Sequence, residues 1–382
     1  MKKHLLSLTM LVVGLNVQAQ SEIFALTGQQ SPQIIFKDFR ALNMNDGQTS
    51  DIIFSSDSTP NVFSETRKIK IDEPKNSYNS SQAQAMATLA LDSSGNQLVY
   101  MPMYSTNFYA LDLKTKNISL IESTVSKAVP CDINTHFTRM TTGYDGNIYT
   151  LNNAGTQLLK ISKENGQFII TDLGALSNDS SNGENKLQIM SVGFGGDLVA
   201  DTQNNLYIFS AAGNVFQFNP NEKIAKFLGK ITGLPENYSL NGAAVNEKGG
   251  IVIGSAKGGN MYEVNLENLS AKPIYGEVQH QIYDLASKYF IGEKRNDIAV
   301  TNNDIFPTKV TDGIINIQLE NTYARTTIRA EIFNMAGIKV IDKIMANERK
   351  ISVLGLPQGM YIVNIAGDKG ESLITKKILI AK

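Results

Sequence analysis

Few side chains in this chain could carry out chemistry. Histidine occurs only at His4, His136 and His280, and Cys131 is the single cysteine. Acidic residues recur near predicted turns, at Asp92, Asp145, Asp197, Asp201 and Glu247. A histidine beside two carboxylates would suit acid–base catalysis by a lyase or hydrolase. His136 and His280 flank predicted inner strands and are weak candidates for a central channel, and ordinary loop histidines are the plainer interpretation.

Other kinds of site find little support. A lone thiol cannot form an internal disulfide or a cysteine-rich zinc site, so Cys131 is interpreted as a small loop residue. No Gly-x-Ser-x-Gly elbow occurs, and glycine pairs such as Gly249-Gly250 are not followed by a helix, as a phosphate loop requires. The recurring acids fit turn chemistry, because Asp and Asn side chains bond to turn backbone, and a calcium site is the alternative. The cofactor is left unknown.

The first residues have the pattern of a secretory signal peptide. A basic region, an apolar run and small residues follow one another, at Lys2-Lys3-His4, Leu5 to Leu15 and Val17-Gln18-Ala19. We predict a signal peptide over residues 1–19, cleaved between Ala19 and Gln20. The run is shorter than the roughly 20 residues that span a membrane, so an anchor is the disfavoured alternative. No other stretch is apolar enough, and we expect no transmembrane segment in the mature chain.

The composition argues against a nucleic-acid partner. The chain is 42% hydrophobic and 19% charged, has no Trp and carries a net charge of −1. Nucleic-acid binders concentrate basic charge on one face, which this balance does not favour. The basic pairs Arg349-Lys350 and Lys376-Lys377 are interpreted as solvated strand edges.

A β-rich repeat runs through the body of the chain. Short apolar strands, each preceded by a polar turn, have anchors 45 to 58 residues apart at Ile53, Leu98, Ile148, Leu206, Ile251 and Ile298. A second apolar strand and then an outer strand follow most anchors, and an inner strand precedes most of them. Four strands at this spacing match the period of β-propeller blades.

We therefore predict an all-β protein with a six-bladed β-propeller over residues 20–302. The Ile298 unit lacks a second strand, and Glu22 to Thr27 resembles the second strand at Asn107 to Asp112. The N-terminal strands are predicted to complete the last blade, since ring closure removes exposed strand edges. Five or seven blades, and a right-handed solenoid, remain alternatives.

Residues 303–382 are predicted to form a small antiparallel β-sandwich. Alternating strands are separated by turns at Asn334-Met335-Ala336-Gly337 and Leu356-Pro357-Gln358-Gly359, and the chain ends in Lys376-Lys377-Ile378-Leu379-Ile380. This pattern resembles the C-terminal sorting domain of the type IX secretion system of Bacteroidetes. The junction keeps only the first proline of the family's aromatic-Pro-Asn-Pro stretch, at Phe306-Pro307. An unrelated fibronectin-like domain is the alternative.

The resemblance implies a route and a partner. It implies passage through the periplasm, recognition by the type IX machinery, and release or attachment at the outer-membrane surface, commonly with removal of the domain. The residues it singles out are Gly337, Leu356, Gly359, Tyr361, Lys376 and Lys377. The glycines would form turns, and the lysines would belong to the terminal strand.

Two functions remain open for the body. The first is a binding module that recognises a glycan or peptide, which fits the lack of a nucleophile or metal motif. The second is an extracellular lyase or hydrolase with its site in the propeller channel. The enzyme hypothesis predicts that His136 or His280 lies within reach of two carboxylates.

Overall fold

The computed structural model describes most of the chain. The described residues are 22–29, 35–44, 47–72, 86–103, 105–129, 132–164, 166–190, 195–278, 280–293, 303–319, 326–346, 348–368 and 370–381. Their only helical elements are η2 (Ser180–Asn182) and α1 (Leu187–Met190). The predicted cleavage site at Ala19 and Gln20, Cys131 and the anchor Ile298 lie outside them. No described helix is long and apolar enough to cross a membrane.

Residues 22–293 form five sheets, each called a blade here and named by its inner strand. Strands are given from the inner strand outward. The β6 blade contains β6 (Met86–Leu91), β7 (Gln97–Pro102), β8 (Phe108–Asp112) and β9 (Ile118–Ile121), and the β10 blade contains β10 (Phe137–Thr142), β11 (Ile148–Asn152), β12 (Leu158–Glu164) and β13 (Gln167–Gly174). The β15 blade contains β15 (Asp197–Ala200), β16 (Leu206–Phe209), β17 (Asn214–Phe218) and β18 (Ile224–Lys230), the β19 blade contains β19 (Leu240–Val245), β20 (Ile251–Ser255), β21 (Asn260–Asn265) and β22 (Ser270–Glu277), and the β23 blade contains β23 (Gln281–Ala286), β1 (Glu22–Gln29), β2 (Ile35–Asn43) and β3 (Thr49–Ser55). Two blades carry extra outer strands: β4 (Val62–Ser64) and β5 (Ile69–Ile71) beside β9, and β14 (Ser177–Asn178) beside β18.

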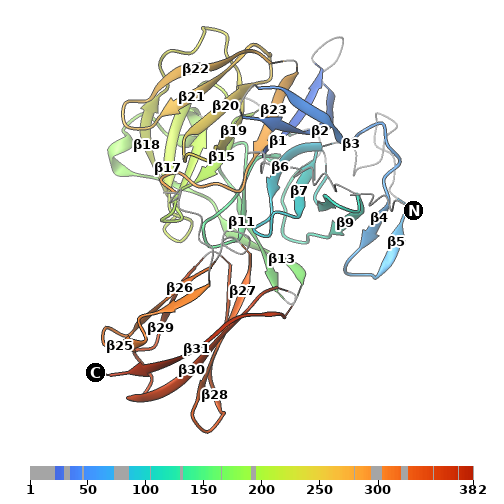
Figure 1. The fold of residues 1–382 in the computed structure, drawn as a ribbon. Helices are drawn as coiled ribbons and strands as arrows, with labels where there is room; N and C mark the ends of the chain where they lie inside the picture. Colours follow the sequence, from blue (N-terminus) through green and yellow to red (C-terminus); the bar gives the residue numbers. More distant parts are fainter. Residues whose placement is uncertain are drawn as a thin grey trace, which may run out of the picture.

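The blades form a propeller-like ring. Their inner strands are neighbours in the order β6, β10, β15, β19, β23 and back to β6, and Figure 1 shows them around a common centre. The predicted sixth blade is not found among the described residues. The strand at Ile53, interpreted as the start of a first blade, is the outermost strand β3 of the β23 blade. The next apolar segment, β4, joins the β6 blade by pairing in parallel with β9.

The N-terminal strands complete the last blade, as the sequence predicted. β1 pairs antiparallel with β23, with Phe24 opposite Ala286 and Leu26 opposite Asp284. The β23 blade therefore takes its inner strand from the end of the body and its other three strands from the beginning. This pairing covers what would otherwise be an open edge at each end of the body.

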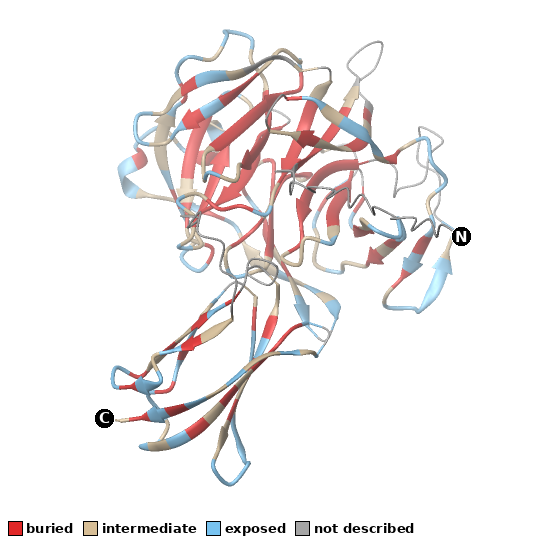
Figure 2. Ribbon diagram, viewed as in Figure 1, coloured by how far each residue is buried: buried red, intermediate tan, exposed pale blue. Residues whose placement is uncertain are grey.

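Apolar side chains pack the blades against one another. Phe39 of β2 meets Tyr100 of β7 at a centroid distance of 5.2 Å, and Tyr100 stacks on Tyr109 at 5.6 Å. Phe108 and Phe137 join the β6 and β10 blades at 6.1 Å. Each such ring pair contributes about 0.5–1.5 kcal/mol beyond its buried area. Figure 2 shows the buried residues gathered on the inner strands, with exposure increasing toward the outer ones.

The tail, residues 303–381, forms two sheets around one core. One contains β24 (Asp304–Phe306), β26 (Ile314–Gln318) and β29 (Lys350–Ser352); the other contains β25 (Lys309–Val310), β31 (Ser372–Ile380), β30 (Gly359–Ala366), β27 (Ile328–Asn334) and β28 (Lys339–Met345). Alternate residues of both sheets face this core, including Ile315, Ile332 and Val363. The tail meets the body at the turn between β10 and β11, where Gly146 lies against Ala346.

Truncation of Leu26 should loosen the whole β23 blade. Leu26 is fully buried, and replacing such a leucine with alanine costs about 2–5 kcal/mol. In the variant Leu26→Ala, amide hydrogen exchange should rise in β23 as well as in β1 and β2. The matched control is Ile332→Ala, which should affect the tail alone. Exchange that rises in β1 and β2 while β23 stays protected would contradict the closure.

Candidate functional site

The centre of the ring is lined by strand edges that lack a neighbour. Each inner strand has a strand partner on one side only, so its other edge presents backbone groups without ladder partners. Leaving such a group buried and unsatisfied costs about 1–3 kcal/mol. Polar side chains that can bond to such backbone groups lie at one level along the ring axis. We call this set of side chains the central cluster. Its members, one from each inner strand, are Thr88, Arg139, Asp197, Asn241 and Asp284, and none is more than 3% exposed.

Asp197 joins three blades through its carboxylate. Its Oδ1 accepts the amide of Leu198 at 2.7 Å. Its Oδ2 accepts the amide of Ala243 in β19 at 2.7 Å and that of Leu285 in β23 at 3.4 Å. Hydrogen bonds to a charged acceptor are stronger than neutral ones, so this carboxylate is an effective link between blades that share no ladder.

Arg139 links the inner strands of the β10 and β15 blades. Its Nη1 donates to the carbonyl oxygens of Asn152 and Asn153 at 3.2 and 3.0 Å. Its Nη2 donates to Asn153 Oδ1 at 3.3 Å and to the carbonyl of Gly195, just before β15, at 3.2 Å. Burial lowers the pKa of Arg139 to about 10, and the nearby Asp197 charge opposes that shift. The guanidinium is therefore still charged at neutral pH.

The glycine pair beside the central cluster is required by close packing. Gly195 and Gly196 have φ angles of +114° and +88°, which disfavour other residues. A Cβ on Gly195 would also collide with the Asn241 side chain, and one on Gly196 with the carbonyl of Phe209. These glycines admit polar side chains at the ring centre and do not form a phosphate loop.

Asp284 is the unusual member of the cluster. It is fully buried, and neither carboxyl oxygen has a hydrogen-bond partner of normal geometry among the described residues. Burial, and then the charge of Asp197, raise the pKa of Asp284 well above its ordinary value, while Thr88 and the Leu89 amide oppose the shift. Burial also raises the pKa of Asp197, but three backbone amides favour its ionised form. We therefore assign the negative charge to Asp197 and the proton to Asp284.

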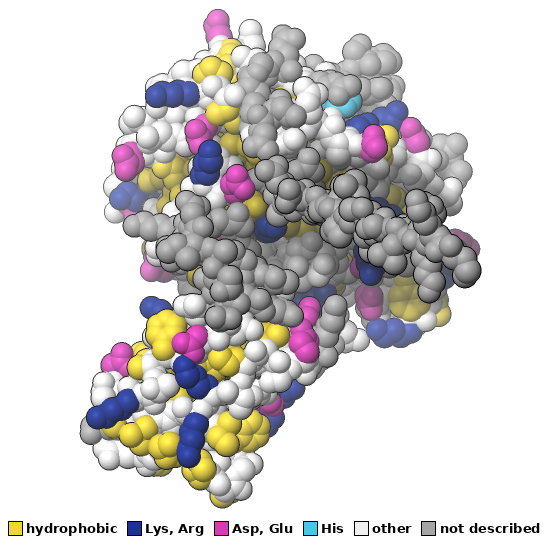
Figure 3. Space-filling view, viewed as in Figure 1, with side chains coloured by type: hydrophobic (Ala, Val, Ile, Leu, Met, Phe, Trp, Pro, Cys, Tyr) yellow, Lys and Arg dark blue, Asp and Glu magenta, His cyan; other side chains and the backbone are white. Residues whose placement is uncertain are grey.

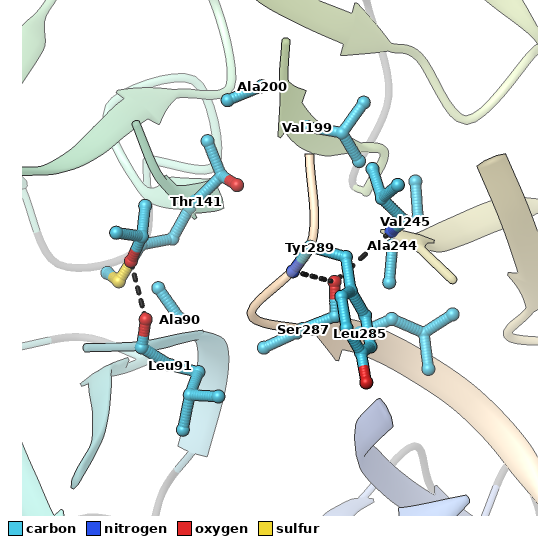
Figure 4. A pocket seen from close by; sticks show the side chains of 14 residues that line it. Ala90, Leu91, Thr141, Val199, Ala200, Ala244, Val245, Leu285, Ser287 and Tyr289 are labelled. Carbon is cyan, nitrogen blue, oxygen red and sulfur yellow. Dashed lines mark hydrogen bonds between the residues drawn. The ribbon is translucent and has the colours of Figure 1, made fainter. Parts of the chain in front are cut away.

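Next to the central cluster the channel narrows to a small cavity. Figure 4 shows Ala90, Thr141, Val199, Ala244 and Leu285 around it. Its free volume is about 10 Å³, which is roughly what one water molecule needs. Ser287 Oγ accepts the amides of Val245 at 3.3 Å and Tyr289 at 3.4 Å at its rim. A sugar ring does not fit this part of the channel.

Each predicted histidine lies near one carboxylate and not near a pair, since the charge of Asp132 acts on His136 and that of Asp38 acts on His280. His136 Nε2 lies 3.2 Å from the Val129 carbonyl oxygen, and burial lowers the pKa of His136. Burial, and then the charge of Arg40, lower the pKa of His280. Neither histidine is among the groups that shift the pKa values of Asp197 and Asp284.

Most of the recurring acids form turns, as the sequence indicated. Asp92 Oδ1 accepts the amides of Asn96 and Gln97, and Asp145 and Asp201 make similar bonds. Glu247 does not hold this position, because Asn246 makes the equivalent bonds to Lys248 and Gly250. Asp197 was wrongly assigned to this group, since it lies in β15 at the ring centre. The described residues contain no group of three His, Cys, Asp or Glu side chains placed to hold a metal ion.

Within the tail, the residues singled out by sequence lie in turns, in the core and on the terminal strand. Gly337 has a φ of +77° in the turn between β27 and β28, and Gly359 begins β30. Leu356 packs against the tail core, and the Tyr361 hydroxyl donates to the Pro357 carbonyl at 3.0 Å. Both lysines lie on β31, where Lys376 pairs with Asp304 and Lys377 is exposed.

Sequence reasoning missed four members of the central cluster: Thr88, Arg139, Asn241 and Asp284. The signal that could have found two of them is a charged residue inside an otherwise uncharged strand. Arg139 interrupts Phe137–Thr142, and Asp284 interrupts Gln281–Ala286. Charged residues are rarely buried unless they are paired or bonded, so both positions indicated a polar centre.

Comparison with known proteins identifies the tail. Residues 304–381 match the family described as a secretion system C-terminal sorting domain. The chain therefore carries the sorting signal of the type IX secretion system and is secreted or attached to the cell surface. No protein of curated function matches this chain.

Three solved structures show similarity to the chain at low identity. They are the extracellular domain of a one-component system of B. thetaiotaomicron (10% identity, 94% of this chain and 50% of that chain, TM-score 0.34), PorZ of Porphyromonas gingivalis, described as an essential surface component of the type IX secretion system (10%, 94% and 51%, 0.31), and virginiamycin B lyase of Staphylococcus aureus (11%, 95% and 97%, 0.35). The chain spans about half the length of the first two.

Replacement of Asp197 should destabilise the body far more than replacement of a turn acid. In Asp197→Asn an amide group takes the place of one carboxylate oxygen and faces backbone donors, so we expect a loss of about 3–5 kcal/mol. The control Asp145→Asn, in an exposed turn, should cost less than about 1 kcal/mol. Urea denaturation measures both. Equal losses would contradict the linking role of Asp197.

Proposed function

We propose that the body is a five-bladed β-propeller that acts outside the cell as a binding module for a glycan or peptide. The tail, folded as a β-sandwich, directs its export. The observation that carries this proposal is that neither carboxyl group at the ring centre is free to act on a substrate. Asp197 is engaged by three backbone amides, and Asp284 is fully buried beside it.

This arrangement disfavours the alternative of a lyase or hydrolase in the channel. Glycoside cleavage needs two carboxyl groups that flank a bound sugar. Asp197 is committed to holding inner strands, Asp284 is fully buried beside it, and the neighbouring cavity has room for about one water molecule. The channel centre therefore supports a structural role, and binding is assigned to the loops.

The loops that lead into β10 and β15 are the best candidates for the binding face. Three large apolar side chains are exposed on them: Val129 at 51%, Ile133 at 45% and Ile189 at 61%. Inner strands of propeller blades run in the same direction, so both loops lie on the same face of the ring. Loops on a rigid scaffold commonly carry binding residues, and exposed apolar side chains suit the faces of sugars or apolar peptide side chains.

The charge distribution fits an uncharged ligand better than a nucleic acid. On the face shown in Figure 3, the described lysines and arginines are interspersed with acidic side chains and form no basic patch. The net charge of −1 agrees with this. A neutral glycan or peptide needs no such patch.

Binding should depend on the three exposed loop residues. In the mature protein, the variant Val129→Ser, Ile133→Ser, Ile189→Ser should lower affinity for a ligand found on glycan or peptide arrays by at least about tenfold, the effect of roughly 1.4 kcal/mol. The control Ile52→Ser, Ile224→Ser changes residues of similar exposure on outer strands and should bind normally. Both variants should melt like the parent protein.

Two results would contradict this proposal. One is equal affinity of the loop variant and the parent for every array ligand. The other is turnover of a polysaccharide that Asp284→Asn abolishes while the variant remains folded, since that result would assign catalysis to the channel.

A further inference from the structure

One of the five gaps between inner strands differs from the others. Side chains cross four gaps with hydrogen bonds: Thr142 Oγ1 to the Leu91 carbonyl at 2.6 Å, Arg139 Nη2 to the Gly195 carbonyl at 3.2 Å, the Ala243 amide to Asp197 Oδ2 at 2.7 Å, and the Val245 amide to Ser287 Oγ at 3.3 Å. In the fifth gap, between β23 and β6, the polar side chains are Asp284 and Thr88. Neither Asp284 oxygen nor Thr88 Oγ1 has a hydrogen-bond partner of normal geometry among the described residues.

This fifth gap is also where the two ends of the body meet. β23 is the last strand of the body and pairs with β1, whereas β6 is the inner strand of the next blade. Across the gap, the blades are otherwise held by apolar packing such as Phe39 against Tyr100. We call this gap the seam.

The groups around Asp284 leave little to balance a second negative charge. From β6 it is faced by Thr88 and the Leu89 amide, and from β15 by the charged Asp197. From β19 the Ala243 amide is bonded to Asp197, and the guanidinium of Arg139 in β10 is bonded to carbonyl oxygens. No ion pair of Asp284 occurs among the described residues. A fully buried second carboxylate here would face another carboxylate without a direct counter-ion.

We propose that the protonation state of Asp284 controls whether the seam is closed or loosened. With Asp284 protonated beside the ionised Asp197 the ring is closed, and loss of the Asp284 proton to bulk water loosens the β23 blade from the β6 blade.

The direction of the pH dependence follows from linkage. Burial and the Asp197 charge raise the pKa of Asp284 in the folded protein above its value in the unfolded chain. The folded state then holds a proton that the unfolded state has lost, so stability falls as pH rises between the two values. A single such group changes the opening equilibrium by up to about tenfold per pH unit.

The test is hydrogen exchange of the mature full-length chain from about pH 4, near the ordinary pKa of an aspartate, up to pH 9, corrected for intrinsic exchange. In the parent protein the protection of β6 and β23 should fall by up to about tenfold per pH unit, while the tail core is unchanged. Asp284→Asn keeps a neutral side chain, so its protection should show no such slope. The control Thr142→Val removes a link at another gap without a titrating group, so it should lower protection equally at every pH.

Three results would overturn the proposal. They are the same slope in Asp284→Asn, a parent protein without any slope, and a slope that calcium ions abolish in the parent alone, which would put a cation in place of the proton. If Asp284→Asn does not fold, a ¹³C-carboxyl titration of the parent decides instead. One buried carboxyl that titrates well above the ordinary aspartate pKa of about 3.9 is the expected result, and ordinary titration of every carboxyl refutes the seam.

Discussion

The inner edges of the five blades face one another across a narrow centre where backbone amides have no strand partners. Water would satisfy such groups in a wide channel, but this one is filled by side chains. Asp197 therefore accepts amides from its own strand and from two other blades. Arg139 donates hydrogen bonds to the carbonyl oxygens of Asn152, Asn153 and Gly195. These bonds fix the inner strands together with the apolar packing between blades, because the described blades share isolated backbone bonds, such as that from the Gly196 amide to the Leu240 carbonyl, and no continuous ladder.

The same constraint gives the ring centre a structural role and leaves the loops as the candidates for ligand binding. Asp197 is bonded to inner strands and Asp284 is fully buried, so both are poorly available to a substrate, whereas the loops that enter β10 and β15 carry exposed apolar side chains. The tail folds around a core of its own and touches the body near Gly146. Under the proposed function, export and binding belong to different parts of the chain, and the ring between them acts as a scaffold.

Local patterns in the sequence predicted the strands, the turn acids and the completion of the last blade by the N-terminal strands, but they placed Glu22 to Thr27 after the Ile298 strand, whereas β1 pairs with the inner strand β23. They predicted six blades, whereas the described residues form five, because the sequence around Ile53 fits a second strand and an outermost strand equally well. Only its partner decides, and that partner, β2, is itself an outer strand here. The central cluster was missed for a related reason. Arg139, Asp197 and Asp284 lie on strands far apart in the sequence, and only ring closure brings them together.

A crystal structure of the mature chain, at a resolution that shows ordered ions and carboxyl geometry, tests the central claim most directly. The account predicts five blades, with Asp197 bound to the amides of Ala243 and Leu285 and with a protonated Asp284 beside it. A sixth blade, or a metal ion or ligand held between the two carboxyl groups, would contradict it.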